Sequence, residues 1–296
     1  MTILITGGCG QLGFELIKRL GEKHDIVAPA RDKLDLANAD AIVQCVRAVK
    51  PTLIINPGAY TAVDKAETEM DAAHAINARA PHVLAEEANR LGIPIVHYST
   101  DYVFDGSATE PYRESDPTAP LGVYGQTKLA GEQAVCAIAA RHLVLRVSWL
   151  YASRRQNFML TMLRLARERS ELRVVGDQLG APTWAGDVAA LSVRALHASS
   201  AGFGFGIADG LYHAAADGVT SWHGFTERII AATRARDTRQ IVKKITAITT
   251  ADYPTPARRP AYSKLSSAKL EAALGTTMSP WEAQLEACLA EMLFAD

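Results

Sequence analysis

Apolar residues form two patterns that alternate along the first half of the chain. Short runs of nearly uninterrupted apolar, often β-branched residues are followed by longer stretches with apolar residues at helical spacing. Strands of this kind, separated by helices, indicate a parallel sheet that is buried on both faces. The order therefore predicts a doubly wound α/β fold. The expected strands cover 3–5, 26–28, 53–56, 95–100 and 143–148, and the expected helices cover 11–21, 39–50, 71–91 and 123–140.

The turn after the first expected strand is rich in glycine. Gly7, Gly10 and Gly13 lie between that strand and a helix that begins near Gln11. In such a turn the first glycine permits a tight bend, the second lets the backbone approach a pyrophosphate, and the third lets the helix pack against the strand. Free N–H groups at the start of the helix favour phosphate. We therefore predict a nicotinamide dinucleotide site, and the Gly-x-x-Gly-x-x-Gly spacing resembles that of short-chain dehydrogenases/reductases.

The end of the second expected strand bears on which cofactor is bound. An acidic side chain there would bind the adenosine ribose of NAD, whereas a basic one would bind the 2′-phosphate of NADP. Residues 27–31 read VAPAR, without an acid, so Arg31 favours NADPH over NADH; a solvated surface arginine is the alternative interpretation. Asp35 and Leu36 follow where a cofactor adenine would lie, although Asp35 is equally typical of the acid at a helix N-terminus.

A tyrosine and a lysine occupy one face of the fourth expected helix. Tyr124 and Lys128 are four residues apart, which brings their side chains together. An ammonium group lowers the pKa of a nearby phenol from about 10 by favouring the phenolate, so this pair is able to protonate a carbonyl oxygen. A third member is expected at the carboxyl end of the preceding strand, where Ser99 and Thr100 point to opposite faces. We assign Thr100 to the site and Ser99 to a structural role.

The second half of the chain has shorter elements interrupted by glycine and proline. Helical patterns at 187–199 and 221–236 flank a strand pattern at 212–216. We expect residues 1–150 to form a Rossmann dinucleotide-binding domain. Residues 151–296 are expected to form mainly a smaller substrate-binding lobe, with some segments returning to the sheet. Because no flexible linker separates the halves, a cleft should lie between them.

Composition excludes several classes of partner. The 31 Lys plus Arg nearly balance the 32 Asp plus Glu, so we expect neither nucleic acid nor an anionic membrane as a partner. The four cysteines (Cys9, Cys45, Cys136 and Cys288) lack the paired spacing of metal or redox sites. The chain has no basic leader and no apolar run near the ~18 residues that span a bilayer. These features predict a cytoplasmic protein.

Several longer motifs point to one family. They resemble the dTDP-4-dehydrorhamnose reductases, which are extended short-chain dehydrogenases/reductases, and the resemblance spans nearly the whole chain. Several of these motifs are more specific than the glycine loop. They are HYSTDYVFDG at 97–106, YGQTKLAGE at 124–132, RVSWLY at 146–151, NF at 157–158, DQLGAPT at 177–183, GLYH at 210–213 and YPTPARRP at 253–260.

The resemblance implies reduction of the C4 ketone of dTDP-4-dehydro-L-rhamnose to dTDP-L-rhamnose by NADPH or NADH. It implies that Tyr124 is the proton donor and that Thr100 orients the ketone. Lys128 is then expected to adjust the pKa of Tyr124 and to hold the nicotinamide ribose. It further implies two groups of contacts. These are Asp101, Tyr102 and Trp149 for the deoxysugar, and Gly10, Gln11, Leu12, Asp35, Leu36, Gly58, Ala59 and Tyr60 for the cofactor.

The chain departs from the family pattern after the third strand. Residues 56–60 read NPGAY where Asn-Ala-Ala-Ala-His is common; the proline removes an N–H, and Tyr60 replaces the usual histidine. Arg258 and Arg259 lie in a proline-rich loop, and we expect one of them to reach the diphosphate of the substrate. The resemblance also raises a homodimer as an expectation, and we assign no metal ligands.

Two other functions fit part of this pattern. A nucleotide-sugar epimerase or dehydratase uses the same tyrosine and lysine but regenerates its cofactor in each turnover. A non-catalytic regulatory subunit would keep the fold and lose part of the triad. Because Tyr124, Lys128 and Thr100 are all present, we favour an enzyme. The sequence leaves open which 6-deoxy-4-ketohexose is the substrate.

Overall fold

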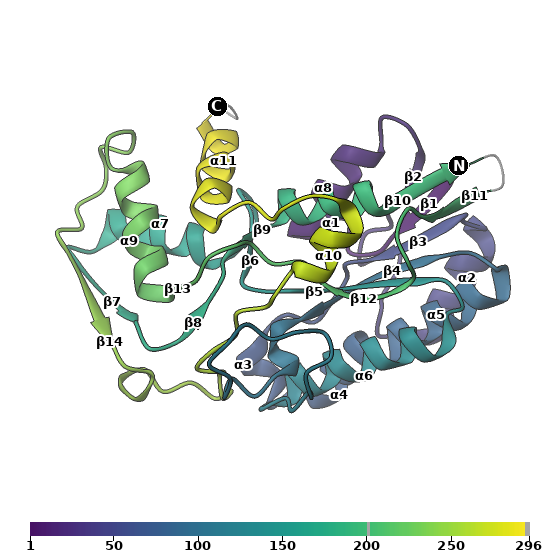
Figure 1. The fold of residues 1–296 in the computed structure, drawn as a ribbon, viewed down its shortest axis with the longest axis horizontal. Coiled ribbons are helices and arrows are strands. Elements are labelled where there is room, and N and C mark those ends of the chain that lie inside the picture. The colour runs from purple at the N-terminus through teal and green to yellow at the C-terminus, as the bar shows by residue number, and fades with distance from the viewer. Residues whose placement is uncertain (200–201, 294–296) are drawn as a thin grey trace.

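The computed structural model describes residues 1–199 and 202–293, and its centre is a six-stranded parallel sheet (Figure 1). The strand order is β12-β5-β4-β3-β1-β2, so the chain reverses direction across the sheet between β1 and β3. Ligands of doubly wound folds bind outside the carboxyl ends of the strands at such a reversal. The strands are β1 (Thr2–Ile5), β2 (Asp25–Val27), β3 (Leu53–Asn56), β4 (Ile95–Thr100), β5 (His142–Val147) and β12 (Gly210–His213).

Alternate residues of the central strands enter two separate cores. Ile3 and Ile5 pack in one core with residues of α1 and α8, whereas Leu4 packs in another with residues of α2, α5 and α6. Helices therefore cover both faces of the sheet, which confirms the predicted doubly wound α/β class. The covering helices are α1 (Gln11–Leu20), α2 (Ala39–Val49), α5 (Ala80–Leu91), α6 (Val123–Ile138) and α8 (Ala185–Ala195).

The helix predicted at 71–91 is interrupted. It consists of α4 (Met70–His74), a π-helical turn (Ala75–Arg79) and α5. Pro81 lies at the start of α5 and has no N–H to donate, so the regular ladder of hydrogen bonds is broken there. The turn buries Asn77, whose side chain bonds both the N–H and the C=O of Tyr60, at 2.8 and 3.0 Å. It thereby fixes the loop that follows β3.

The second half of the chain has its own core, made of residues from α7, α9, α11 and β7. Figure 1 shows this lobe beyond one end of the sheet, while β12 returns to pair with β5. The helix predicted at 187–199 is wrong at its end, because α8 stops at Ala195 and the chain continues as a strand. The division at residue 150 stays a prediction.

The remaining elements are short or belong to this lobe. They are α3 (Val63–Ala66), α7 (Phe158–Glu168), α9 (Trp222–Thr233), α10 (Ala268–Leu274), α11 (Trp281–Leu293), β6 (Leu150–Tyr151), β7 (Glu171–Val175), β8 (Leu179–Gly180), β9 (Thr183–Trp184), β10 (Leu196–Ser199), β11 (Gly202–Phe205), β13 (Thr220–Ser221), β14 (Lys244–Ile248) and the 3₁₀ turns Asp101–Val103 and Thr250–Asp252.

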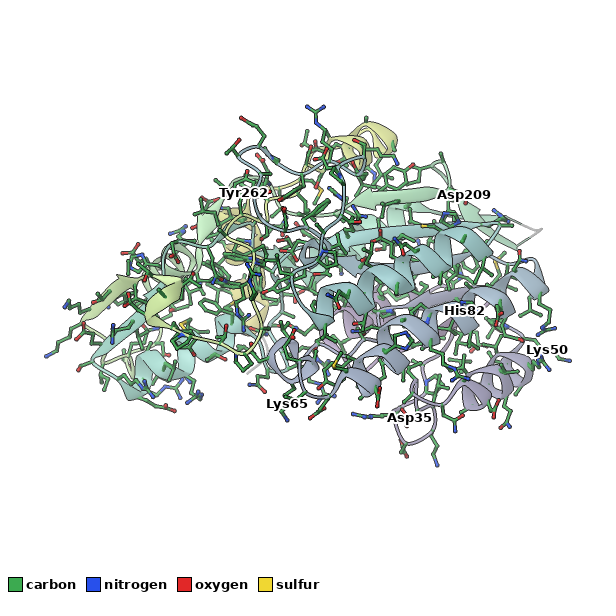
Figure 2. The ribbon with its side chains drawn as sticks, turned by 90° about the horizontal axis from the view of Figure 1, so that it is seen from below. Asp35, Lys50, Lys65, His82, Asp209 and Tyr262 are labelled. Atoms are coloured by element: carbon green, nitrogen blue, oxygen red, sulfur yellow. The ribbon has the colours of Figure 1, made fainter. Side chains whose placement is uncertain are left out.

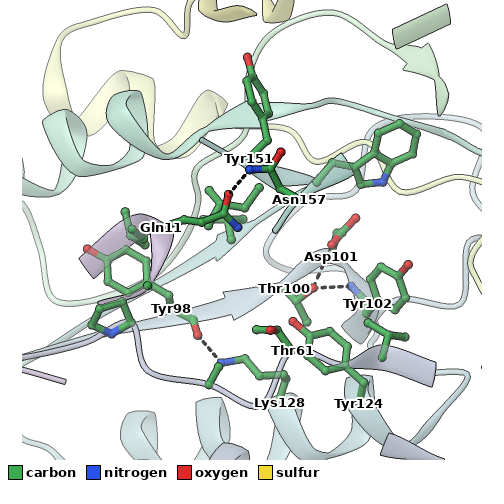
Figure 3. Close-up of a pocket in the computed structure, with 18 of the residues that line it drawn as sticks. Gln11, Thr61, Tyr98, Thr100, Asp101, Tyr102, Tyr124, Lys128, Tyr151 and Asn157 are labelled. Atoms are coloured by element: carbon green, nitrogen blue, oxygen red, sulfur yellow. Dashed lines mark hydrogen bonds between the residues drawn. The ribbon is translucent and has the colours of Figure 1, made fainter. Parts of the chain in front are cut away.

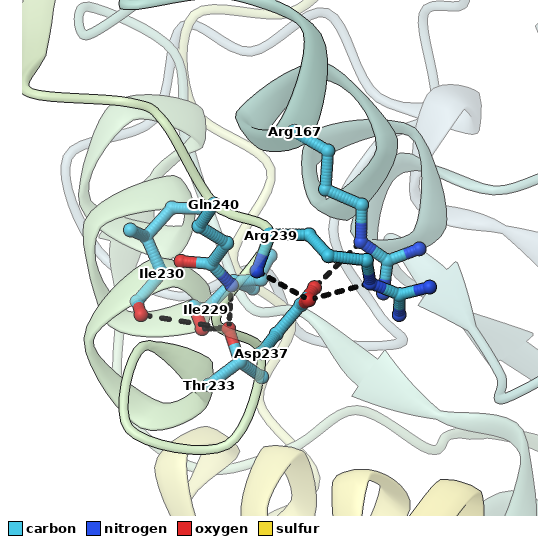
Figure 4. A network of polar contacts seen from close by, with 7 residues as sticks. All are labelled: Arg167, Ile229, Ile230, Thr233, Asp237, Arg239 and Gln240. Atoms are coloured by element: carbon cyan, nitrogen blue, oxygen red, sulfur yellow. Dashed lines mark hydrogen bonds and ion pairs between the residues drawn. The ribbon is translucent and has the colours of Figure 1, made fainter.

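A polar network joins α7 to the loop that follows α9 (Figure 4). The Asp237 carboxylate accepts hydrogen bonds from the Nε atoms of Arg167 and Arg239, at 2.6 and 3.1 Å. Although burial raises the pKa of Asp237, these hydrogen bonds bring it below its ordinary value. Gln240 donates to Thr233 at 2.7 Å and closes the turn. The network stabilises the outer end of the lobe, which lies far from the sheet (Figure 1).

In the described part of the chain, no helix combines the length and the apolar character that crossing a membrane requires.

Candidate active site

A cleft of about 580 Å³ opens at the carboxyl ends of the central strands and is lined by residues from both halves of the chain. A second cavity of about 170 Å³ adjoins it, and Gly7, Gly58 and Ala59 line both. The two cavities together form an elongated site at the reversal point of the sheet. Such a shape suits a ligand with two parts joined at the glycine loop.

The glycine loop has the geometry of a phosphate cradle. Gly7 has φ +59°, in the left-handed region that favours glycine, and a Cβ there would lie 2.7 Å from the Cα of Gly58. A Cβ on Gly13 would clash with the carbonyl oxygen of Gly7. Gly10 caps α1 without a side-chain hydrogen bond, and the first turn of α1 holds no acid. Gly10, Gln11, Leu12 and Gly13 line the cleft, so the residues present fit a dinucleotide diphosphate.

The smaller cavity has the features expected of an adenosine site. Arg31, Asp35 and Leu36 all line it, as the sequence predicts. Arg31 is exposed, and Asp35 lies at the periphery of the molecule (Figure 2). The Asp35 carboxylate also accepts a hydrogen bond from the N–H of Ala37 at 3.0 Å, so it shapes the local turn as well.

The predicted triad converges in the larger cleft (Figure 3). Thr100 ends β4, while Tyr124 and Lys128 project from the first two turns of α6. Lys128 is buried, and its Nζ donates to the carbonyl oxygen of Tyr98 at 2.5 Å. Thr100 donates to the Asp101 carboxylate at 2.9 Å. Ser99, which we assigned to a structural role, also lines the cleft.

The protonation of this triad differs from the expectation. Burial raises the pKa of the Tyr124 phenol well above its ordinary value, and a hydrogen bond with Thr100 only partly offsets this. The predicted lowering by Lys128 is wrong here, because the Lys128 amine is turned toward the Tyr98 carbonyl. Burial lowers the pKa of Lys128 itself to about 8. In this structure the Tyr124 phenol is therefore protonated at neutral pH.

Asp101 is the buried carboxyl group of the site. Its Oδ2 accepts a hydrogen bond from Ser148 at 2.9 Å, and its Oδ1 accepts the one from Thr100. Burial raises its pKa to about 6, and hydrogen bonds from Ser263, Ser148 and Thr100 limit that rise. The carboxyl group therefore anchors the Thr100 hydroxyl beside the cleft.

Two tryptophans form an aromatic wall of the cleft. The rings of Trp149 and Trp222 are stacked, with centroids 3.5 Å apart and planes 5° from parallel. Trp149 has φ +45° and donates from Nε1 to Ser263 at 3.1 Å, while Trp222 donates to Gln178 at 3.2 Å. Trp149 lies where the sequence predicts, at the carboxyl end of β5. Trp222 begins α9 and is separated from Trp149 by more than seventy positions, so no local pattern indicates it.

The structure separates the two adjacent arginines. Arg259 lines the cleft, donating to Asp64 at 2.8 Å and to the Tyr102 hydroxyl at 3.3 Å. Arg258 is exposed and is not among the residues that line the cleft. Of the pair, only Arg259 is placed to meet a ligand.

Comparison with known proteins identifies the family of this chain, and the matches cover nearly its whole length. The family model described as the RmlD substrate binding domain matches residues 1–294. A dTDP-4-dehydrorhamnose reductase from Burkholderia thailandensis is 43% identical over 296 residues, and the match covers 99% of each chain. The chain belongs to the dTDP-4-dehydrorhamnose reductase family.

Solved structures of dTDP-4-dehydrorhamnose reductases agree with this assignment. The enzyme from Clostridium acetobutylicum superposes with a TM-score of 0.90 at 37% identity, covering 99% of this chain and 100% of that one. The enzyme from Bacillus anthracis, solved in complex with NADP, has a TM-score of 0.89 at 35% identity, covering 98% of this chain and 99% of that one.

The loop at 56–60, where this member of the reductase family departs from the common pattern, is only partly directed at the site. Pro57, Gly58 and Ala59 line the cleft. Tyr60 does not lie where we predicted it. Its backbone is held by Asn77, and its hydroxyl donates to Glu69 at 2.6 Å, away from both cavities. The prediction followed the position of the loop, whereas the direction of the side chain depends on its contact with Glu69, the residue that precedes α4.

Sequence reasoning missed several residues of the cleft. Asn157 and Phe158 belong to one of the family motifs, which was the available signal, and Asn157 bonds Gln11 at 3.1 Å. Thr61 lies in the loop after the third strand and Val63 begins α3, and neither belongs to a specific sequence pattern. Leu150 and Tyr151 end another of the family motifs, at 146–151, whereas Arg155, Gln156, Trp222 and Phe225 gave no signal.

Proposed function

We propose that this protein reduces the C4 ketone of dTDP-4-dehydro-L-rhamnose to dTDP-L-rhamnose, with NADPH as the reductant. The observation that carries the proposal is the convergence of Tyr124, Lys128 and Thr100 in the cleft that begins at the glycine loop. Membership in the reductase family supports the substrate and the reaction.

The residues of the cleft divide the chemistry among them. Bound NADPH supplies a hydride, which becomes the new C–H bond at C4. Tyr124 gives its phenolic proton to the ketone oxygen, so the C=O double bond becomes an alcohol and the phenolate is later reprotonated from solvent. Thr100, whose hydroxyl donates to Asp101 in this structure, would turn that donor to the ketone oxygen and hold it near Tyr124. The Lys128 ammonium, which also lines the cleft, would hold the nicotinamide ribose of the cofactor.

The outer part of the cleft suits a nucleotide-linked sugar. Asp101, Tyr102 and Trp149 offer a carboxyl group, a phenol and an indole face to the deoxysugar. Arg259 presents a guanidinium group, which binds phosphate oxygens in pairs. Its partner Asp64 is more than a third exposed, so that ion pair leaves Arg259 available to a diphosphate.

The test is to mix the purified protein with dTDP-4-dehydrorhamnose and NADPH and to follow the absorbance of the reduced cofactor. We expect consumption that depends on the sugar and equals the dTDP-rhamnose formed. An epimerase or dehydratase would change the sugar without net oxidation of NADPH. A non-catalytic protein would bind the cofactor and consume none. Other 6-deoxy-4-ketohexoses, supplied in parallel, test how strictly the sugar is selected.

A further inference from the structure

Arg155 reaches from the second half of the chain to the glycine loop. Its Nε donates to the carbonyl oxygen of Cys9 at 2.8 Å, and Cys9 lies inside the loop, next to Gly10. Arg155 is exposed and lines the cleft together with Gly10 and Gln11. Because Nε already has its partner, both Nη groups remain for another acceptor.

The backbone of Arg155 is held in a conformation that costs energy. Its φ is +62°, in the left-handed region, which is strained for residues other than glycine. Such conformations persist where surrounding contacts impose them, and they gather at functional sites. A glycine at this position would adopt the same φ without strain. The contacts of the arginine side chain must therefore account for its presence here.

Asn157 imposes the conformation and ties it to the cofactor cradle. Its Nδ2 lies within hydrogen-bond distance of the carbonyl oxygens of Ala152, Arg154 and Arg155, at 2.8, 3.2 and 3.4 Å. The same Nδ2 lies 3.1 Å from Oε1 of Gln11, the first residue of α1. The segment that carries Arg155 is therefore connected directly to the helix start at which a diphosphate would bind.

The charge of Arg155 has no acidic partner among the ion pairs of the described residues, which are 1–199 and 202–293. Of the other two cations that line the cleft, Lys128 donates to the Tyr98 carbonyl and Arg259 forms an ion pair with the partly exposed Asp64. The first turn of α1 holds no acidic residue that could neutralise the charge of Arg155. The cradle thus has one guanidinium group beside it whose charge is not neutralised.

We propose that Arg155 binds the diphosphate of the nicotinamide cofactor. Its Nε stays on Cys9 while its Nη groups bond phosphate oxygens that also accept from the N–H groups of the α1 start. The inference rests on the proposed function, because it takes NADPH as the ligand. The diphosphate of the sugar nucleotide is the competing source of the same chemistry, and the contact with Cys9 favours the cofactor.

The test uses Arg155→Gly, which removes the guanidinium group and accepts the positive φ without strain. We expect the Kd values of both NADPH and NADH to rise by about tenfold, as for the loss of a charge-assisted contact. The Kd of dTDP should stay within twofold. Raising the salt concentration should weaken NADPH binding less in the variant than in the wild type. The melting temperature should be unchanged or higher, which separates lost binding from lost folding.

Arg154→Ala is the matched control. Arg154 is the adjacent arginine, but its guanidinium group stacks over the ring of Phe14 at 3.6 Å and does not line the cleft. This variant should bind NADPH as tightly as the wild type does.

Four outcomes overturn the proposal. The first is an NADPH affinity of Arg155→Gly equal to that of the wild type. Weaker binding of NADPH alone assigns Arg155 to the 2′-phosphate, and weaker binding of dTDP assigns it to the diphosphate of the substrate. A wild-type protein that binds neither cofactor overturns the proposed function together with this inference, whereas the first three outcomes leave the proposed function standing.

Discussion

The amine of Lys128 is hydrogen-bonded to the carbonyl oxygen of Tyr98, at 2.5 Å, and this contact joins helix α6 to strand β4 below the cleft. Tyr124, one turn earlier, is hydrogen-bonded to Thr100, which ends that strand. The relative position of proton donor and hydroxyl is therefore set by a helix packed on a strand. Both elements are rigid, as a precisely oriented proton transfer requires.

The pKa of Lys128 predicts a pH limit on catalysis. Burial lowers it to about 8, so the amine is charged below that pH and neutral above it. Because kcat/KM reports the free enzyme, kcat/KM for NADPH should be level below pH 8 and should fall about tenfold per pH unit above it. In Lys128→Met, kcat/KM should be lower than in the wild type at every pH and should not fall above pH 8. A wild-type profile that stays level to pH 10 would contradict the role of the Lys128 charge.

Tyr124→Phe tests the proton donor. The variant keeps the ring and its edge-to-face contact with Tyr102, at 5.6 Å between centroids, so the fold and the cofactor site should be preserved. We expect turnover to fall by at least about 100-fold, as for the loss of a general acid. The Kd of NADPH, measured by fluorescence titration, should change by less than twofold. Retention of most of the rate would show that another group supplies the proton.

Arg31→Ala tests the choice of cofactor. Arg31 lines the smaller cavity, where the 2′-phosphate of NADPH would lie. Loss of its charge should raise the Kd of NADPH by about tenfold and leave that of NADH nearly unchanged. Lys33→Ala is the matched control, since Lys33 is a nearby exposed cation that does not line this cavity. Equal affinities of the wild type for NADPH and NADH would remove the preference we propose.

Asp101 predicts a change of stability with pH. Its pKa is raised from 3.8 to about 6 by burial, so between these values the folded protein binds a proton that the unfolded chain has lost. The contribution of this group to stability therefore falls as pH rises from about 4 to about 6, by on the order of 2 to 3 kcal/mol. Asp101→Asn lacks a titrating group. Thermal unfolding of both proteins should show the variant gaining stability relative to the wild type across this window, and a constant difference would contradict the raised pKa.

The sequence by itself determined the features that depend on neighbouring residues. Short, nearly uninterrupted apolar runs indicated the strands of the sheet, because strands of a parallel sheet are buried on both faces. The glycines at 7, 10 and 13 indicated the cofactor loop. The four-residue spacing of Tyr124 and Lys128 placed them on one helical face. In each case the physical cause acts within one or two turns of backbone.

Only the tertiary structure decided contacts between distant segments. Arg155 meets Cys9 across 146 positions, and Arg259 meets Asp64 across 195. The same is true of Trp222, which stacks on Trp149. Tyr60 is a case of shorter range: its hydroxyl donates to Glu69, the residue that precedes α4. The pKa of Tyr124 belongs here as well, because burial by surrounding elements outweighs the neighbouring lysine that the spacing supplies. Which side chain faces the cleft, and in which protonation state, depends on how whole elements pack, and no local pattern contains that information.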